Sequence, residues 1–231
     1  MRKTFLALLM LAFAALSAND ARSAPYNAYD EFASHQGANG VWHYLKFTGS
    51  TSTYGELTFH ESSHLGSPAW LGTDGDLFWL PAISKDFTEV HHPEYGDMLH
   101  MHPGDNHSRH DVVLRWIAPD SGPYAINMSL VAPANRAGAG SDGYDVYLEH
   151  NGSPIRDKIN VPPADDEIWH HANETVDVVA GDLIDLRINH IDENGHDAAY
   201  VDLQIEPIPE PSALALFALG LLGCLRRARR R

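Results

Sequence analysis

Short alternating segments fill the middle of this chain and limit its possible folds more than any other feature. In four of them apolar residues occupy every second position: Val112/Leu114/Trp116, Tyr144/Val146/Leu148, Ile184/Leu186/Ile188 and Val201/Leu203/Ile205. A period of two places each set on one face of a β-strand. No run of ten or more residues in this region has a convincing helical period. The sequence therefore predicts an all-β domain.

Ten strands are expected along the chain. Their ranges are 41–48, 55–60, 76–80, 97–102, 111–117, 123–131, 143–149, 174–179, 183–190 and 198–205. Strong turn formers separate several of them, for example Asn151-Gly152. Many short strands with regular turns predict an antiparallel sandwich or barrel. The only cysteine, Cys224, lies in the tail, so no disulfide is expected in this domain.

The first 24 residues have the pattern of a secretory signal peptide. Arg2 and Lys3 precede an apolar run over 5–16, and small residues follow up to Ala24. At 1.5 Å per residue this run covers about 18 Å, too little for roughly 30 Å of hydrocarbon, so a signal helix is favoured over an anchor. Cleavage is expected after Ala18 or a few residues later, up to Ala24.

Three features follow one another at the C-terminus: Pro209-Glu210-Pro211, an apolar run over 213–225, and five arginines among the last six residues. This order resembles the PEP-CTERM sorting signal over residues 207–231. The resemblance implies that an exosortase, an integral membrane cysteine transpeptidase, recognises the motif and removes the tail after transient membrane insertion. It also implies export to the cell envelope, outer surface or extracellular matrix of a Gram-negative-type bacterium. The alternative is an ordinary tail anchor with its arginines in the cytoplasm.

The segments VVLRWIAPDSGPYAINMSL, SDGYDVYLEHNG and VVAGDLIDLRINH are similar to the jelly-roll domain common in exported proteins with such a tail. This resemblance covers roughly residues 95–206, and the domain resembles carbohydrate-binding modules in architecture. The expected organisation is a signal helix at 1–24, an antiparallel jelly-roll β-sandwich at 25–206 and a hydrophobic sorting helix within 207–231.

The predicted mature domain is strongly acidic. Residues 25–208 contain 8 Lys and Arg against 29 Asp and Glu, a formal charge of −21. Such a charge repels nucleic acid and anionic membrane surfaces. The negative charge would attract divalent cations. The alternative is that it only keeps the domain soluble outside the cell.

Histidines cluster in the first half, with eight of the fifteen between His60 and His110. If 97–102 is a strand, His100 and His102 share one face, as two imidazole ligands of one metal would. Asp105, His107 or His110 is a candidate third ligand. The pair resembles that of cupins, but the cupin glutamate is missing at its usual spacing. The alternative is a set of polar strand and turn residues.

A second candidate metal site lies in HIDENGHDAAYVD. Asp192, Glu193, Asn194 and Asp197 place oxygen ligands around Gly195, as a calcium loop does, although the spacing is not that of an EF-hand. The alternative is an Asx-rich turn between two strands.

Three aromatic residues are candidates for sugar binding: Trp70, Trp79 and Tyr95 lie in the less regular first half, where loops would present flat rings to a ligand. Such rings are equally good core material, and Trp42 and Trp116 are expected to be core.

The sequence contains neither a Gly-x-Ser-x-Gly nor a His-Glu-x-x-His element. The sequence therefore predicts a non-catalytic, exported surface or matrix protein, and the resemblance to carbohydrate-binding modules implies extracellular polysaccharide as its partner. The rival interpretations are a metal-dependent enzyme that uses the His100/His102 face and a purely structural envelope protein.

Overall fold

The computed structural model of the chain describes residues 24–36, 40–49, 51–61, 63, 67–72, 80–85, 95–104, 110–133, 141–191 and 197–209. Within these residues the structure is built from β-strands and contains no α-helix. The signal helix and the sorting helix predicted from the sequence lie outside the described residues. So does the predicted strand at 76–80, apart from Leu80.

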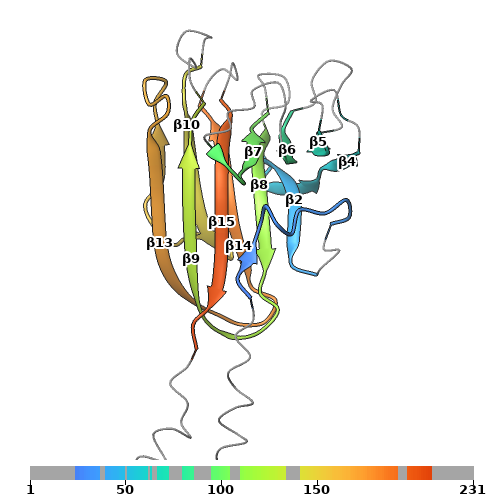
Figure 1. Cartoon of the computed structure of the whole chain (residues 1–231), viewed down its shortest axis with the longest axis vertical. Coiled ribbons are helices and arrows are strands. Elements are labelled where there is room, and N and C mark those ends of the chain that lie inside the picture. Colours follow the sequence, from blue (N-terminus) through green and yellow to red (C-terminus); the bar gives the residue numbers. More distant parts are fainter. Residues whose placement is uncertain are drawn as a thin grey trace, which may run out of the picture.

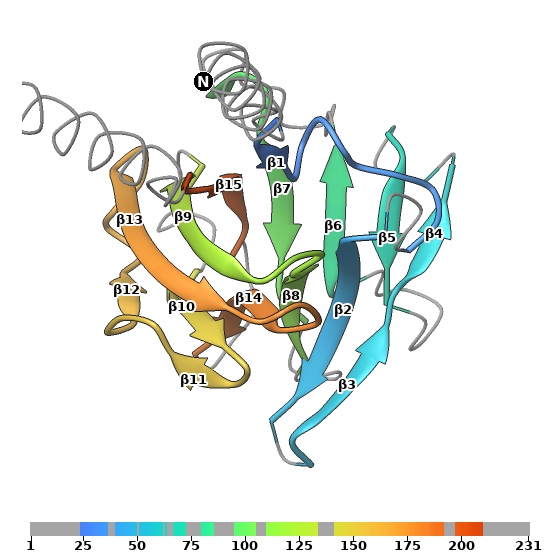
Figure 2. The same ribbon diagram turned by 90° about the horizontal axis from the view of Figure 1, so that it is seen from below.

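Two antiparallel sheets face each other (Figures 1 and 2). The first sheet has the order β13 (Trp169–Val178), β9 (Gly122–Val131), β15 (Ala199–Pro207), β7 (Leu99–His102), β6 (Ala82–Lys85), β5 (Ala69–Leu71) and β4 (Thr58–His60), and β1 (Tyr26–Asn27) pairs with β15. The second sheet has the order β11 (Ser153–Pro154), β10 (Tyr144–His150), β14 (Leu183–His190), β8 (His110–Ile117), β2 (Trp42–Thr48) and β3 (Thr53–Glu56), and β12 (Ile159–Val161) pairs with β10.

The connections are those of a jelly roll. The first sheet contains the order β7-β15-β9-β13, and the second contains β8-β14-β10 with β12 on the far side of β10. From β7 to β10 and from β12 to β15, each strand lies in the sheet opposite its predecessor. This interleaving of eight strands in two sheets defines the double Greek key. The predicted antiparallel jelly-roll sandwich is confirmed.

The alternating apolar sets form the interior. All four sets lie in one core cluster, and each of their side chains is at most 3% exposed. Aromatic rings join the two inner faces: Tyr44 of β2 stacks on Trp70 of β5 with ring centroids 5.0 Å apart, and Trp116 of β8 meets Tyr124 of β9 edge-on at 5.0 Å. The interior is therefore closed by side chains of both sheets.

Strand boundaries differ from the sequence prediction where polar residues face solvent. β13 begins at Trp169, five residues earlier than predicted, and pairs with β9 along its whole length. The predicted strand at 55–60 is divided into β3 and β4 around the buried Leu57. The turn at Asn151-Gly152 is confirmed: both residues have positive φ, 51° and 77°, as a two-residue hairpin turn requires.

Candidate functional site

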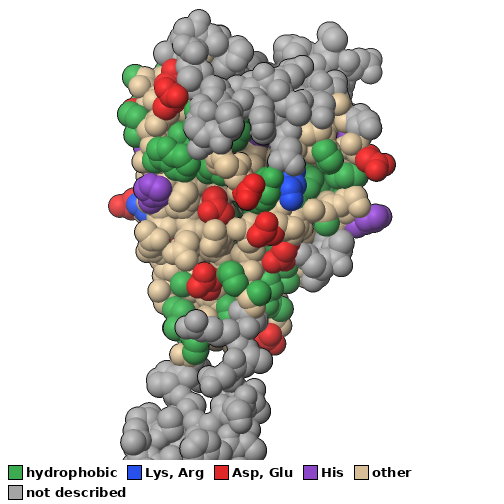
Figure 3. Space-filling model, in the orientation of Figure 1, with side chains coloured by type: hydrophobic (Ala, Val, Ile, Leu, Met, Phe, Trp, Pro, Cys, Tyr) green, Lys and Arg blue, Asp and Glu red, His purple; other side chains and the backbone are tan. Residues whose placement is uncertain are grey.

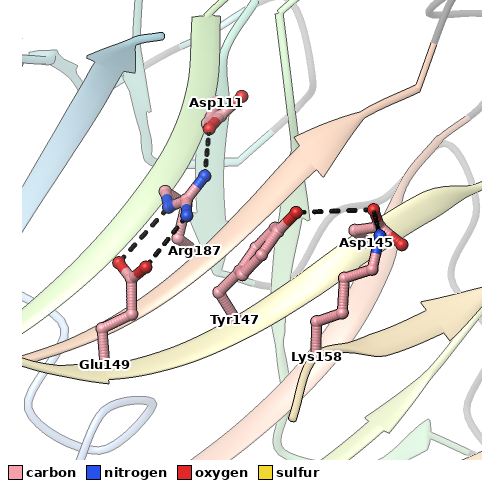
Figure 4. A network of polar contacts seen from close by, with 6 residues as sticks. All are labelled: Asp111, Asp145, Tyr147, Glu149, Lys158 and Arg187. Carbon is pink, nitrogen blue, oxygen red and sulfur yellow. Dashed lines mark hydrogen bonds and ion pairs between the residues drawn. The ribbon is translucent and has the colours of Figure 1, made fainter. Parts of the chain in front are cut away.

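The outer face of the second sheet is closed by a network of charged side chains (Figure 4). Arg187 on β14 donates to Asp111 of β8 at 2.7 Å and to Glu149 of β10 at 2.9 Å. Its guanidinium also lies 4.0 Å from the centre of the Tyr147 ring. Burial lowers the pKa of Arg187, but the two carboxylates more than offset this, and the net shift is upward.

Two further ion pairs complete this face. Arg115 of β8 makes a bidentate pair with the buried Asp185 of β14 at 2.7 and 2.8 Å. At the other edge Lys158 and Asn160 donate to Asp145 of β10. Burial raises the pKa of Asp145, but these hydrogen bonds outweigh it and lower the pKa overall. The arginines of this face are thus already bound to carboxylates of neighbouring strands.

The outer face of the first sheet is different, because it carries a cavity of about 330 Å³. An aromatic and apolar wall is formed by Tyr95, Met98 and Trp169. The other side chains that line the cavity are polar: Asn27, Asp30, Asp97, Ser129, Asp202 and Gln204. We call this cavity the Trp169 pocket. Figure 3, in the orientation of Figure 1, shows Asp and Glu side chains distributed over this face.

The period of two explains which residues reach the Trp169 pocket. Ser129 of β9 and Asp202 of β15 are Cα partners, and both alternate with buried neighbours that face the core. On the other side of β15, Asn27 of β1 lies opposite Gln204. The Asn27 side chain also accepts the backbone N–H groups of Tyr29 and Asp30, at 2.9 and 3.0 Å, and so orients the turn that carries Asp30.

Trp169 gives the pocket its open aromatic surface. Its side chain is 44% exposed, whereas Tyr95 behind it is 6% exposed and meets it edge-on at 6.4 Å. Tyr95 in turn packs on Tyr200 of β15 at 4.7 Å. His171, two residues along β13, lies nearly parallel to the Trp169 ring and is hydrogen-bonded to Ser129 at 3.0 Å. The ring is therefore held in place while one part of it faces solvent.

The carboxylates of the Trp169 pocket influence one another. Burial raises the pKa of Asp202, a hydrogen bond from Gln204 lowers it, and the charge of Asp30 raises it, with a net upward shift. No Lys or Arg is among the described residues that line the pocket. Its potential is therefore negative, and it presents hydrogen-bond acceptors beside a flat apolar ring.

The three predicted sugar-binding aromatics are found in different places. Tyr95 lines the Trp169 pocket. Trp70 is 5% exposed, stacks on Tyr44 and donates to the Ala33 carbonyl at 3.0 Å, so its ring faces the core. Trp79 lies outside the described residues. Sequence reasoning missed Trp169, because the first residues of β13 are mostly polar and show no apolar alternation that would mark the start of a strand.

His100 and His102 lie side by side on β7, with ring centroids 6.4 Å apart, as the predicted strand requires. Both are buried; His102 donates to the Pro103 carbonyl at 2.8 Å, and Ser84 lies 3.5 Å from His100 Nδ1. His110 is on β8, in the other sheet, and contacts Thr48 at 2.9 Å. Asp105 and His107 lie outside the described residues. Within the part of the chain that the structure describes, no three His, Cys, Asp or Glu residues are grouped as metal ligands.

The predicted calcium loop is largely outside the described residues, which exclude Asp192 and Asn194. Asp197 is fully buried and accepts a hydrogen bond of 2.6 Å from Ser141. In the sorting motif Pro209 is described and exposed, whereas Glu210 and Pro211 are not described. The described segments include no helix long and apolar enough to cross a membrane.

Residues 207–231 match the family described as the PEP-CTERM protein-sorting motif, with the boundaries predicted from the sequence. The motif marks proteins that are exported and sorted to the cell surface of Gram-negative-type bacteria and processed by an exosortase. This chain is accordingly an exported protein with a jelly-roll domain between its two ends. A search of curated proteins finds no match.

Solved structures with a similar arrangement include a family 35 carbohydrate-binding module from Clostridium thermocellum, at 12% identity and a TM-score of 0.31, covering 71% of this chain and 98% of that one. Pika GITRL is matched at 16% identity and a TM-score of 0.30, over 73% and 99% of the two chains. The sugar-binding C-terminal domain of EclA is matched at 9% identity and a TM-score of 0.33, over 41% of this chain and 64% of that domain. This chain thus spans less than two thirds of that domain's length. The fold assignment rests on the strand order above, and no function is taken from these names.

The Arg187 network predicts a large effect on stability. Arg187→Ala leaves the carboxylates of Asp111 and Glu149 without the guanidinium between them, which is expected to lower the free energy of unfolding by about 3–5 kcal/mol. Chemical denaturation at pH 7 measures the loss. The control Lys158→Ala removes a half-exposed cation from the same face and is expected to have a much smaller effect. Equal losses in the two variants would contradict the buried character of the Arg187 pairs.

His100 predicts a specific dependence of stability on pH. Burial, and then the neighbouring His102, lower the pKa of His100 to about 3. The unfolded chain takes up this proton below about pH 6.5, so the folded state loses stability as the pH falls from 6.5 towards 3. From pH 7 to pH 5 the loss is about 2 kcal/mol. His100→Gln should remove about this much from the difference between the unfolding free energies at pH 7 and pH 5; an unchanged difference would show that His100 is solvated.

Proposed function

We propose that this exported chain is a non-catalytic surface protein whose β-sandwich binds neutral polysaccharide in the Trp169 pocket. The observation that carries the proposal is a 44% exposed tryptophan ring beside a cavity lined by six polar side chains. A pyranose ring has an apolar face, which packs on an aromatic ring, and a rim of hydroxyl groups. Those hydroxyls donate to carboxylates and exchange hydrogen bonds with amide side chains.

The size and the rigidity of the pocket support this assignment. A volume of about 330 Å³ lies within the range of small-ligand pockets. Asn27, Ser129, Trp169, Asp202 and Gln204 project from paired strands, and Asp30 from the turn fixed by Asn27. Tyr95, Asp97 and Met98 lie in the segment directly before β7, where Tyr95 and Met98 are buried. Little ordering is therefore needed when a ligand binds. The acidic lining, with no described cation, favours neutral sugars over uronic acids and sulfated sugars.

Trp169→Ala tests the proposal. Loss of a central aromatic contact is expected to weaken binding by at least about 2 kcal/mol, roughly thirtyfold in Kd. Affinity electrophoresis and calorimetry with soluble glucans, xylans and mannans measure it. Tyr54→Ala is the matched control, because Tyr54 is 40% exposed but belongs to the second sheet. No binding by the wild type to any of these glycans, or equal binding by Trp169→Ala, would refute the proposal.

Charge selectivity gives a second test. Binding of polygalacturonate is expected to be at least about tenfold weaker than binding of the best neutral glycan, since Asp30 and Asp97 repel its carboxylates. Asp30→Asn combined with Asp97→Asn, or a higher salt concentration, should reduce that difference. A preference of the wild type for polygalacturonate would contradict the assigned charge of the site. Release of reducing ends from a bound glycan would overturn the non-catalytic part of the proposal.

A further inference from the structure

The last strand leads directly into the sorting motif. β15 ends at Pro207, which pairs with Tyr124 of β9, and the N–H of Ile208 still donates to the Pro123 carbonyl at 2.8 Å. The Pro-Glu-Pro motif begins at the next residue, Pro209. No linker therefore separates the folded domain from the site of processing.

The distance to the membrane is equally short. Only residues 209–212 lie between Ile208 and the apolar run that begins at Ala213. Four residues extend over at most about 14 Å. While the apolar run is inserted, the end of the sandwich from which the tail leaves is thus held close to the membrane that contains the exosortase.

Hydrogen bonds connect the turns at that end of the sandwich. The β8–β9 turn and the β13–β14 turn are joined there, because Ser121 accepts the N–H of Ala180 at 2.9 Å and Ala118 exchanges backbone hydrogen bonds with both Gly181 and Asp182. The N-terminal β1 also pairs with β15 near this end, with Tyr26 opposite Ile205. An enzyme that encloses the motif meets this folded end one residue before Pro209.

We propose that the end of β15 is a latch: the exosortase processes the chain only when the residues from Glu206 onward have detached from β9. Detachment of Glu206, Pro207 and Ile208 adds about 10 Å of extended chain before the motif. Strand ends open locally at a lower free energy than the whole domain, so the latch opens without global unfolding. Removal of the tail then depends on whether the end of β15 is paired with β9.

A disulfide across the latch tests this inference in the host cell. Ala125 and Glu206 are Cα partners on the outer face, at a spacing that suits a cross-strand disulfide, and an exported domain meets an oxidising compartment. In a full-length Cys224→Ala chain, Ala125→Cys combined with Glu206→Cys should slow removal of the tail by at least about tenfold in a pulse-chase experiment. Glu206→Cys alone, and the double variant under reducing conditions, should be processed at the rate of the parent chain.

A linker distinguishes the latch from a general defect. Ten Gly and Ser residues inserted between Ile208 and Pro209 provide about 17 Å of flexible reach, so the motif becomes accessible with β15 closed. Processing should then be at least as fast as in the parent, and the disulfide should have no effect. Equal rates for the oxidised and reduced variants in the chain without the linker would overturn the proposal. A disulfide that slows the linker chain equally would also overturn it, because the cause would then be folding or export.

Discussion

Burial of the alternating apolar sets between two sheets is the constraint on which the rest of this structure depends. Trp42, Trp116 and Tyr44 are each about 1% exposed or less, and contacts such as Tyr44 on Trp70 connect the two inner faces. Because the side-chain period of a strand is two, burying one set places the intervening residues on the outer surface. The two outer faces are therefore set by the same register that closes the core.

Those two outer faces have opposite characters. On the second sheet, arginines on β8 and β14 bind carboxylates of neighbouring strands, so charge is neutralised locally and the face is closed. On the first sheet, Asp30, Asp97 and Asp202 have no described Lys or Arg beside them in the cavity, and a half-exposed Trp169 lies next to them. The difference makes the first sheet the ligand-binding face in our proposal.

The position of the chain ends connects this fold to its export. β1 and β15 are antiparallel neighbours with Tyr26 opposite Ile205, so the first and last described residues of the domain lie close together at one end of the sandwich. The Trp169 pocket extends from Asn27 and Gln204 along the outer face towards Trp169, and so lies on the side of the sandwich rather than at the end from which the tail leaves.

Much of the fold could be predicted from residues close in sequence. Sets such as Ile184/Leu186/Ile188 identified strands because alternation is a local signal, and Asn151-Gly152 identified a hairpin because its turn needs positive φ. Short strands such as β5 and β6 carry too few residues to show a period. Trp70, by contrast, was a candidate for ligand binding and is core, because burial depends on which strand lies opposite.

By itself, the sequence determined the export signals, the all-β class and the acidity of the domain, since these depend on composition and on patterns within a few residues. Only the tertiary structure decided the strand order, the partners of Arg187 and the convergence of Asn27, Asp97, Trp169 and Asp202 on one cavity. The physical reason is that these residues are far apart along the chain. Their proximity arises from the crossings of a jelly roll between two sheets, and no local preference encodes those crossings.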